Sequence, residues 1–240
     1  MRKAALTKTE KAYQSLRKAI VTGQILPNGP LHEHDLMKRF GHGRTPIREA
    51  LKRLTLERFV VWPARSTPYV KGVSPQDLQR LYEARLTLEG PIARMAARRI
   101  TEPELKELDR LCVELEQAIA AGEIYKATEI DYAIHIAIAQ GSDNIVLAEA
   151  VGHLIRGCLH LWYNAGKHFG VEATPLTHLS IVESLRARDA EACVEKVNEH
   201  IFNSYRRQLK LMELSLEEFM PSRLKSIPEV TLSGFDERVL

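Results

Sequence analysis

The larger part of the chain, from Ser74 onward, has no strand pattern, and this restricts its fold to helices. Apolar residues recur three and four positions apart in six successive segments, the spacing that places them on one face of an α-helix. Such helices bury their apolar faces against one another. We therefore predict a mainly α protein whose C-terminal part is an all-α six-helix bundle. The expected helices begin near Ser74 and Thr101 and then span 123–140, 144–167, 175–188 and 189–213.

Charge is divided unevenly on either side of Gly72. Residues 1–72 contain 15 basic and 5 acidic side chains, a net charge of +10, whereas residues 73–240 contain 19 and 26, a net charge of −7. Ten excess positive charges in a short module are typical of binding to the phosphate backbone of nucleic acid. The sequence therefore predicts two domains, 1–72 and 73–214, followed by a tail at 215–240.

The same sequence favours a cytoplasmic protein without a membrane partner. Charged residues interrupt every apolar stretch before it reaches the ~18 residues that a membrane helix needs. Arg2, Lys3 and Lys8 precede any apolar run, which argues against a signal peptide. The three cysteines are widely separated and odd in number, so they fit neither a disulfide framework nor a thiolate zinc cluster, and we expect them in the core.

The basic module has the pattern of a winged helix-turn-helix. A capping box at Thr7–Glu10 opens a first helix that ends at Gly23, and a short second helix ends at Gly41. A third helix follows directly and carries an apolar stripe. Two short strands are expected at 59–62 and 68–71, around a loop that contains Arg65.

One face of the third helix is suited to a DNA groove. Arg44, Arg48 and Lys52 recur every four residues opposite the apolar stripe, with Thr45 beside them. A helix with a row of cations and hydroxyls on its exposed side fits the major groove of DNA. Together with Arg65 in the loop between the strands, these residues are our candidate DNA-binding set.

The run Arg44-Thr-Pro-Ile-Arg-Glu-Ala-Leu51 resembles the DNA-binding domain of the GntR family of bacterial transcription regulators. The resemblance implies that Arg44 and Arg48 contact operator bases and phosphates, and that Thr45 contacts a phosphate. Arg58 stands where the family pattern usually has glycine before the first wing strand, and the usual wing-tip glycine is absent from 65–67.

Four residues of the helical part form a candidate metal site. Asp131 and His135 are four residues apart on one expected helix, and His178 and His200 lie on the last two helices. One carboxylate and three imidazoles make a plausible shell for a divalent transition metal. Taken alone, an Asp-x-x-x-His pair is more often a surface ion pair or a satisfied core imidazole.

The order and spacing of these four residues resemble the FCD effector-binding domain of the FadR subgroup of the GntR family. The resemblance implies that Asp131, His135, His178 and His200 hold zinc, nickel or manganese, with zinc ranked first. It also implies that a small organic acid binds beside the metal through its carboxylate.

The run Glu83-Ala-Arg85-x-x-Leu-Glu89 matches the pattern of the FCD family, and this resemblance makes Arg85 a candidate for binding the effector carboxylate. It lies on the apolar stripe of its helix, where an unpaired guanidinium is costly and needs an anion. An internal salt bridge to Glu89 or to another acidic side chain explains the residue equally well. Asn203 and Arg207 extend the His200 face of the last helix and are further candidates for the same pocket.

These patterns and the resemblance to the GntR family together predict a homodimeric, ligand-responsive transcription factor rather than an enzyme, and the resemblance favours a repressor. Two winged modules bind a roughly palindromic operator, a small carboxylate at the metal releases them, and hinge residues near Gly72 relay the effect. Two alternatives remain: a metal-dependent enzyme that acts on a small carboxylic acid, and a nucleic-acid packaging module with a structural metal.

Overall fold

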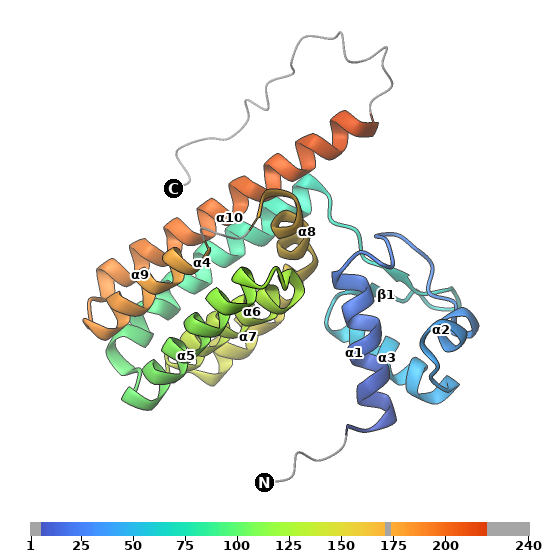
Figure 1. The fold of residues 1–240 in the computed structure, drawn as a ribbon, viewed down its shortest axis with the longest axis horizontal. Helices are drawn as coiled ribbons and strands as arrows, with labels where there is room; N and C mark the ends of the chain where they lie inside the picture. Colours follow the sequence, from blue (N-terminus) through green and yellow to red (C-terminus); the bar gives the residue numbers. More distant parts are fainter. Residues whose placement is uncertain (1–5, 171–173, 220–240) are drawn as a thin grey trace.

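The computed structural model describes residues 6–170 and 174–219, and their elements form two regions (Figure 1). Three helices and a hairpin form the N-terminal region, and seven helices form the C-terminal region within these residues. The N-terminal elements are α1 (Lys8–Val21), α2 (Glu33–Phe40), α3 (Arg44–Leu56), β1 (Val60–Val61) and β2 (Tyr69–Val70). The C-terminal elements are α4 (Pro75–Arg99), α5 (Glu102–Ala120), α6 (Ile124–Gln140), α7 (Ile145–Arg156), α8 (Leu159–Phe169), α9 (Thr174–Arg186) and α10 (Ala190–Phe219).

The N-terminal region has the predicted winged helix-turn-helix order. The hydroxyl of Thr7 accepts a hydrogen bond from the backbone N–H of Glu10 and so caps α1. Gly41 ends α2 with a left-handed conformation, φ 67°, and Gly43 precedes α3 as its N-cap. The two strands are antiparallel and shorter than expected, with Val60 opposite Val70.

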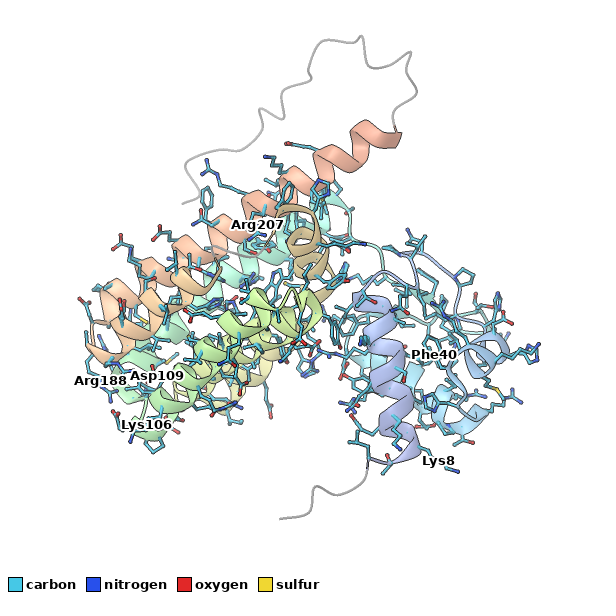
Figure 2. The ribbon with its side chains drawn as sticks, viewed as in Figure 1. Lys8, Phe40, Lys106, Asp109, Arg188 and Arg207 are labelled. Atoms are coloured by element: carbon cyan, nitrogen blue, oxygen red, sulfur yellow. The ribbon has the colours of Figure 1, made fainter. Side chains whose placement is uncertain are left out.

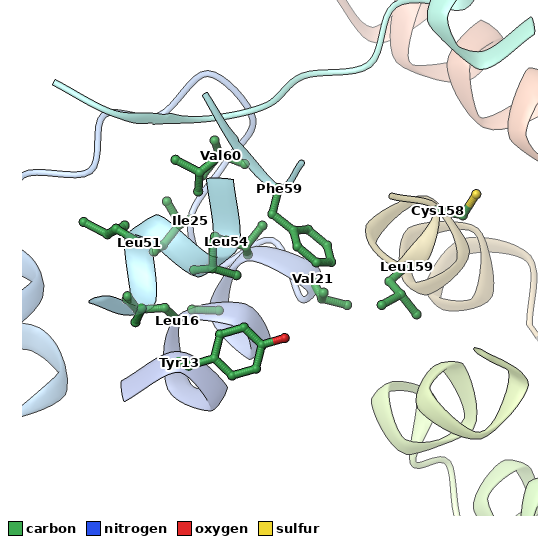
Figure 3. Close-up of a cluster of buried hydrophobic side chains, with 14 of the residues drawn as sticks. Tyr13, Leu16, Val21, Ile25, Leu51, Leu54, Phe59, Val60, Cys158 and Leu159 are labelled. Atoms are coloured by element: carbon green, nitrogen blue, oxygen red, sulfur yellow. The ribbon is translucent and has the colours of Figure 1, made fainter. Parts of the chain in front are cut away.

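The apolar faces of α1 and α3 meet in a core that Figure 3 shows in detail. Leu16, Leu51 and Leu54 are fully buried there, and Val60 of the hairpin closes one side. Val21 and Phe59 lie on the side of this core that faces Leu159 of α8 (Figure 3). The buried cluster is therefore continuous between the two regions.

The C-terminal region is a bundle in which α10 lies along α4 (Figure 1). A capping box opens α4, where Ser74 and Asp77 exchange hydrogen bonds, and another opens α5 at Thr101 and Glu104. Helix α6 packs against α5, α7 and α8, and α9 packs against α5 and α10. The all-helical architecture is as predicted.

The segment expected as one helix at 144–167 is two helices, α7 and α8, which meet at a bend of 51°. The predicted six helices are therefore seven. At the break, the N–H of Cys158 bonds the carbonyl of Ile155, and the imidazole of His160 bonds the carbonyl of Gly157. Glycine tolerates such an interruption of a helix.

The last helix also continues further than expected, to Phe219 rather than about residue 213. The remainder of the predicted tail, 220–240, lies outside the described residues. No single helix among the described residues has the length and apolarity to cross a membrane. Only the bent pair of α7 and α8 meets that criterion, by length and composition.

Candidate functional site

The predicted DNA-binding side chains lie together on the exposed face of α3. The side chains of Arg44, Arg48 and Lys52 are 72%, 51% and 56% exposed, and Thr45 is exposed beside them. The opposite face of the helix is fully buried in the core described above. The amphipathic spacing seen in the sequence therefore produces one continuous cationic surface.

Neighbouring carboxylates form weak ion pairs with the cations of this surface. The carboxylate oxygens of Glu33 on α2 lie 3.0 Å from Nε of Arg44 and 3.8 Å from Nε of Arg48. Oε1 of Glu49 lies 2.7 Å from Nζ of Lys52. Exposed pairs of this kind contribute about 0–1 kcal/mol. Phosphate groups can therefore displace these carboxylates at little cost.

The wing loop contains Arg65, the remaining member of the predicted DNA-binding set. Arg65 is exposed between β1 and β2 and has a left-handed backbone, φ 58°. Arg58, which precedes β1, is also left-handed, with φ 63°. Both conformations favour glycine. This backbone preference explains why the GntR pattern usually has glycine at these two positions, which are arginines here.

The predicted metal ligands are brought together by three helices of the bundle. Asp131 and His135 lie on α6, His178 lies on α9 and His200 lies on α10. All four are buried, none more than 8% exposed. One potential ligand atom from each residue lies within 4.8 Å of the other three.

The distances between ligand atoms are suited to a shared ion. The Nε2 atom of His178 lies 3.1 Å from Oδ1 of Asp131, and the Nε2 atoms of His135 and His200 are 3.2 Å apart. Neighbouring ligand atoms are about 3 Å apart when bonds to the ion are ~2.0–2.1 Å long. Three imidazoles and one carboxylate also form a donor set that zinc and similar divalent ions accept.

Two further side chains orient the imidazoles. Glu89 of α4 lies 2.8 Å from Nδ1 of His135, and the hydroxyl of Thr177 lies 3.0 Å from Nδ1 of His200. Each contact turns the opposite nitrogen, Nε2, toward the cluster. Outer partners of this type are usual at histidine metal sites. From the sequence, Glu89 is expected to pair only with Arg85 and Thr177 carries no signal, because spacing along one helix does not reveal a contact with another helix.

The electrostatics of the cluster keep two of its side chains, His200 and Asp131, in the forms that bind metal. Burial, followed by the neighbouring His178 and His135, lowers the pKa of His200 well below its usual value, so the imidazole is neutral at pH 7. Burial alone raises the pKa of Asp131, but His178, His135 and Arg85 together outweigh burial and lower the pKa overall. Asp131 is therefore an anion.

A cavity of about 210 Å³ adjoins the cluster. Asp131 and His200 line one side of it, so a ligand in the cavity can reach the metal site. Trp162 and several aliphatic side chains from α5, α6 and α8 line much of the remainder. Asn203 and Arg207, both candidates from the sequence, also line it, and Arg207 lies where α10 passes near α8 (Figure 2).

Gln208 is a lining residue that sequence reasoning missed. It is 2% exposed, and its Oε1 atom accepts no hydrogen bond from the described residues. A ligand with a hydroxyl or N–H group facing Gln208 would satisfy this oxygen.

Arg85 forms the internal salt bridge that was one of its two predicted roles. It is fully buried, and its Nε donates to Oε1 of Glu89 over 2.6 Å. Burial raises the pKa of Glu89, but Arg85 and His135 outweigh it and lower the pKa to about 2. Arg85 does not line the cavity, although its guanidinium carbon lies 5.0 Å from the ring of Trp162, which does. Its Nη1 and Nη2 atoms donate to none of the described residues.

Comparisons with known families match both regions of the chain. Residues 8–70 match the model for bacterial regulatory proteins of the gntR family. Residues 80–203 match the FCD domain, and this match covers more than half of the chain. All nine residues predicted from the sequence for DNA or metal binding lie within the two matched ranges.

Curated relatives align over most of their length. The HTH-type transcriptional regulator YdhC of Bacillus subtilis (strain 168) is 28% identical over 202 residues, 82% of this chain and 89% of YdhC. The HTH-type transcriptional repressor RspR of Escherichia coli (strain K12) is 26% identical over 193 residues, 80% of this chain and 85% of RspR. The solved structure of E. coli McbR/YncC superposes with a TM-score of 0.74 at 20% identity, covering 87% of this chain and all of McbR/YncC, which supports the fold.

Proposed function

Because the chain belongs to the GntR family and carries an FCD domain, it is a DNA-binding transcriptional regulator rather than an enzyme, and we propose that it is a repressor released by a small carboxylate. The proposal rests mainly on one observation: the cavity adjoins a buried set of metal-binding side chains. The similarity to the repressor RspR supports the direction of control.

We assign the metal to Asp131, His135, His178 and His200, with zinc as the first choice and nickel or manganese as alternatives. When bound, the ion would supply a Lewis-acidic anchor for a carboxylate group. The chain itself provides an apolar wall at Trp162 and polar groups on α10. This lining suits a small organic acid whose carboxylate faces the histidines and whose body is partly apolar.

For DNA binding, we propose that α3 enters the major groove of the operator. Arg44 and Arg48 read bases and phosphates, Thr45 and Lys52 contact the backbone, and Arg65 of the wing approaches the adjacent groove. The exposure of all five residues supports this assignment. A homodimer would present two such faces to a palindromic site.

Helix α6 is suited to couple the two sites because it carries two metal ligands and also contacts the DNA-binding region. Arg17 of α1 donates two hydrogen bonds to the carboxylate of Glu129, at 2.7 and 2.8 Å. These side chains are 13% and 29% exposed, so water screens the pair only partly. A shift of α6 at the metal site would therefore act directly on α1.

A second connection runs from α6 to the end of α3. Tyr132 accepts hydrogen bonds from Arg156 of α7, and Arg156 lies 3.5 Å from the buried carboxylate of Glu57. Glu57 follows the last residue of α3 and accepts a hydrogen bond from the hydroxyl of Tyr13 over 2.7 Å. The effector must favour one arrangement of these contacts, because equal affinity for both would shift nothing.

A footprint on DNA from the region upstream of the protein's own gene tests the proposed function. We expect metal-loaded protein to protect a dyad-symmetric site, with affinity that falls as salt rises. A screen of small carboxylates should contain one that removes the protection. Absence of any protected duplex at low ionic strength would contradict the proposal, and uniform protection would indicate the packaging alternative.

The role of α6 has a separate test in Glu129→Gln, which keeps the shape of the side chain and removes its charge. We expect this variant to bind the metal and the operator but to respond to the releasing carboxylate several-fold less than the unmodified protein. Glu149→Gln, at an exposed glutamate of α7, is the matched control and should respond normally. Equal responses of the two variants would remove Arg17 and Glu129 from the coupling.

A further inference from the structure

A second and larger cavity lies between the two regions of the molecule. Its volume is about 320 Å³. Phe59 and the neighbouring end of the hairpin line it from the DNA-binding region, and α4, α7 and α8 line it from the bundle. None of the four proposed metal ligands belongs to its lining, so this interdomain cleft is separate from the effector cavity.

Positive charge predominates around the interdomain cleft. Arg58, Lys71 and Arg80 line it and are exposed, and none of the three lies within 4 Å of a carboxylate among the described residues. Asp77 is the one acidic side chain of the lining. It is committed to the α4 cap, where it accepts hydrogen bonds from the N–H and hydroxyl of Ser74.

The polar lining also includes His153 of α7 and two side chains of α8, His160 and Asn164. Burial, with a smaller effect from Lys71, lowers the pKa of His160 to about 4, so its ring is neutral at pH 7. Asn164 lies one turn further along α8 and also lines the cleft. Apart from the two imidazoles, the three cations and the single anion give the cleft a net charge of about +2.

We propose that the interdomain cleft binds a small dianion, either a phosphate ester or a dicarboxylate. Two negative charges would balance the excess positive charge, and the volume exceeds that of a simple inorganic ion. Arg58 follows α3, whereas Arg80 lies on α4. A dianion that contacts both would therefore tie the end of the recognition helix to the bundle, independently of the metal site.

Calorimetric titration of the full chain with inorganic phosphate and with succinate tests the proposal, at constant ionic strength maintained with chloride. The double variant Lys71→Gln/Arg80→Gln removes two cations of the cleft. Arg98→Gln is the control: Arg98 is an exposed cation that lies on α4, as Arg80 does, but outside the cleft. We expect the double variant to bind the preferred probe at least tenfold more weakly, and Arg98→Gln to bind within twofold of the unmodified protein.

His200→Ala separates this cleft from the metal site. Dianion binding that survives His200→Ala and fails in the double variant would support the cleft, even if the proposed effector response were absent. Binding that is lost in His200→Ala, or unchanged in the double variant, would overturn the proposal. Operator binding should also be measured in buffer without dianions. If the double variant weakens it more than Arg98→Gln does, Lys71 and Arg80 contact DNA, and the proposal is overturned. A preference for phosphate or for succinate identifies the chemical source.

Discussion

Two regions of the molecule hold their charged groups in opposite ways. One is the exposed face of α3 with Arg44, Arg48 and Lys52, which we call the recognition face, and the other is the cluster of Asp131, His135, His178 and His200. On α3 the side chains of Arg44, Arg48 and Lys52 are more than half exposed, and their neighbouring carboxylates contribute little. In the cluster the side chain of Asp131 is 12% exposed and that of His178 is fully buried, and Glu89 and Thr177 fix the other two imidazoles. The first arrangement leaves the cations adaptable, whereas the second prepares a fixed geometry before any ligand arrives.

This contrast determines how each site should respond to substitution. Burial of Asp131 among three imidazoles costs desolvation free energy, which only good hydrogen bonds or a bound cation can offset. The exposed cations of α3 carry no such cost. Substitutions in the cluster should therefore change metal binding and stability together, whereas substitutions on α3 should change DNA binding alone.

The largest expected effect is the loss of the metal from the cluster. His178→Ala and His200→Ala each remove one of four ligands, and we expect metal affinity to fall by more than ~100-fold. Metal that binds only the folded state stabilises it, so the thermal midpoint measured with metal should fall in both variants. Elemental analysis after dialysis reads the metal content directly.

His168→Ala is the control for these two variants, because His168 is an exposed histidine outside the cluster. It should retain the full metal content. Full retention in His178→Ala and His200→Ala as well would defeat the metal assignment.

The grouping of Asp131, His135, His178 and His200 could be predicted from the sequence because their spacing matches a family pattern, whereas the side chains that contact two of these histidines could not. Glu89 lies on α4 and Thr177 precedes His178 on α9. Their contacts with His135 and His200 depend on how four helices pack, and periodicity within one helix contains no such information. The cavity residue Gln208 was missed for the same reason.

A smaller effect is expected from Glu89→Gln, which keeps the size of the side chain and removes its charge. The amide accepts a weaker hydrogen bond from Nδ1 of His135 and pairs less well with Arg85. We expect metal affinity to fall about 10- to 100-fold, measured by competition with a chelator. Glu83→Gln is the control, because Glu83 is an exposed glutamate of the same helix. Equal affinities in the two variants would show that Glu89 does not support the metal site.

On the recognition face, Arg48→Ala should weaken operator binding by ~1–3 kcal/mol, the range for an arginine that reads a base. Its stability should stay within about 0.5 kcal/mol of the unmodified protein. Arg110→Ala on α5 is a close control, because both arginine side chains are 51% exposed. Operator affinity that is the same in both variants would show that α3 does not face the DNA.

The exposed face of α3 was predictable because one amphipathic helix defines it alone. The break between α7 and α8 was not, since the apolar stripe that includes Leu154 and Cys158 continues across it. A single Gly157 inside a helical pattern does not predict a break. The bend, and the contact between His160 and the backbone of Gly157 beside it, are visible only in three dimensions.

The smallest effect concerns the end of α3, where Arg58 occupies a position that favours glycine. The N–H of Arg58 bonds the carbonyl of Thr55, and the N–H of Phe59 bonds that of Leu54. These two bonds form a Schellman motif with Arg58 in its left-handed position. Removing the side chain relieves steric strain but adds backbone entropy to the unfolded state. We expect Arg58→Gly to stabilise the protein by about 0.5–1 kcal/mol in urea unfolding without dianions.

Gly122 provides a reference for the stability change at Arg58, because α5 ends in the same motif with glycine in the left-handed position, φ 68°. A Cβ atom at Gly122 would meet no other atom within 4 Å. The cost of Gly122→Ala is therefore purely conformational, and we expect a loss of about 1 kcal/mol. If Gly122→Ala destabilises while Arg58→Gly has no effect, contacts of the Arg58 side chain must offset its strain. In that case Arg58 contributes its charge to the interdomain cleft without lowering the free energy of unfolding.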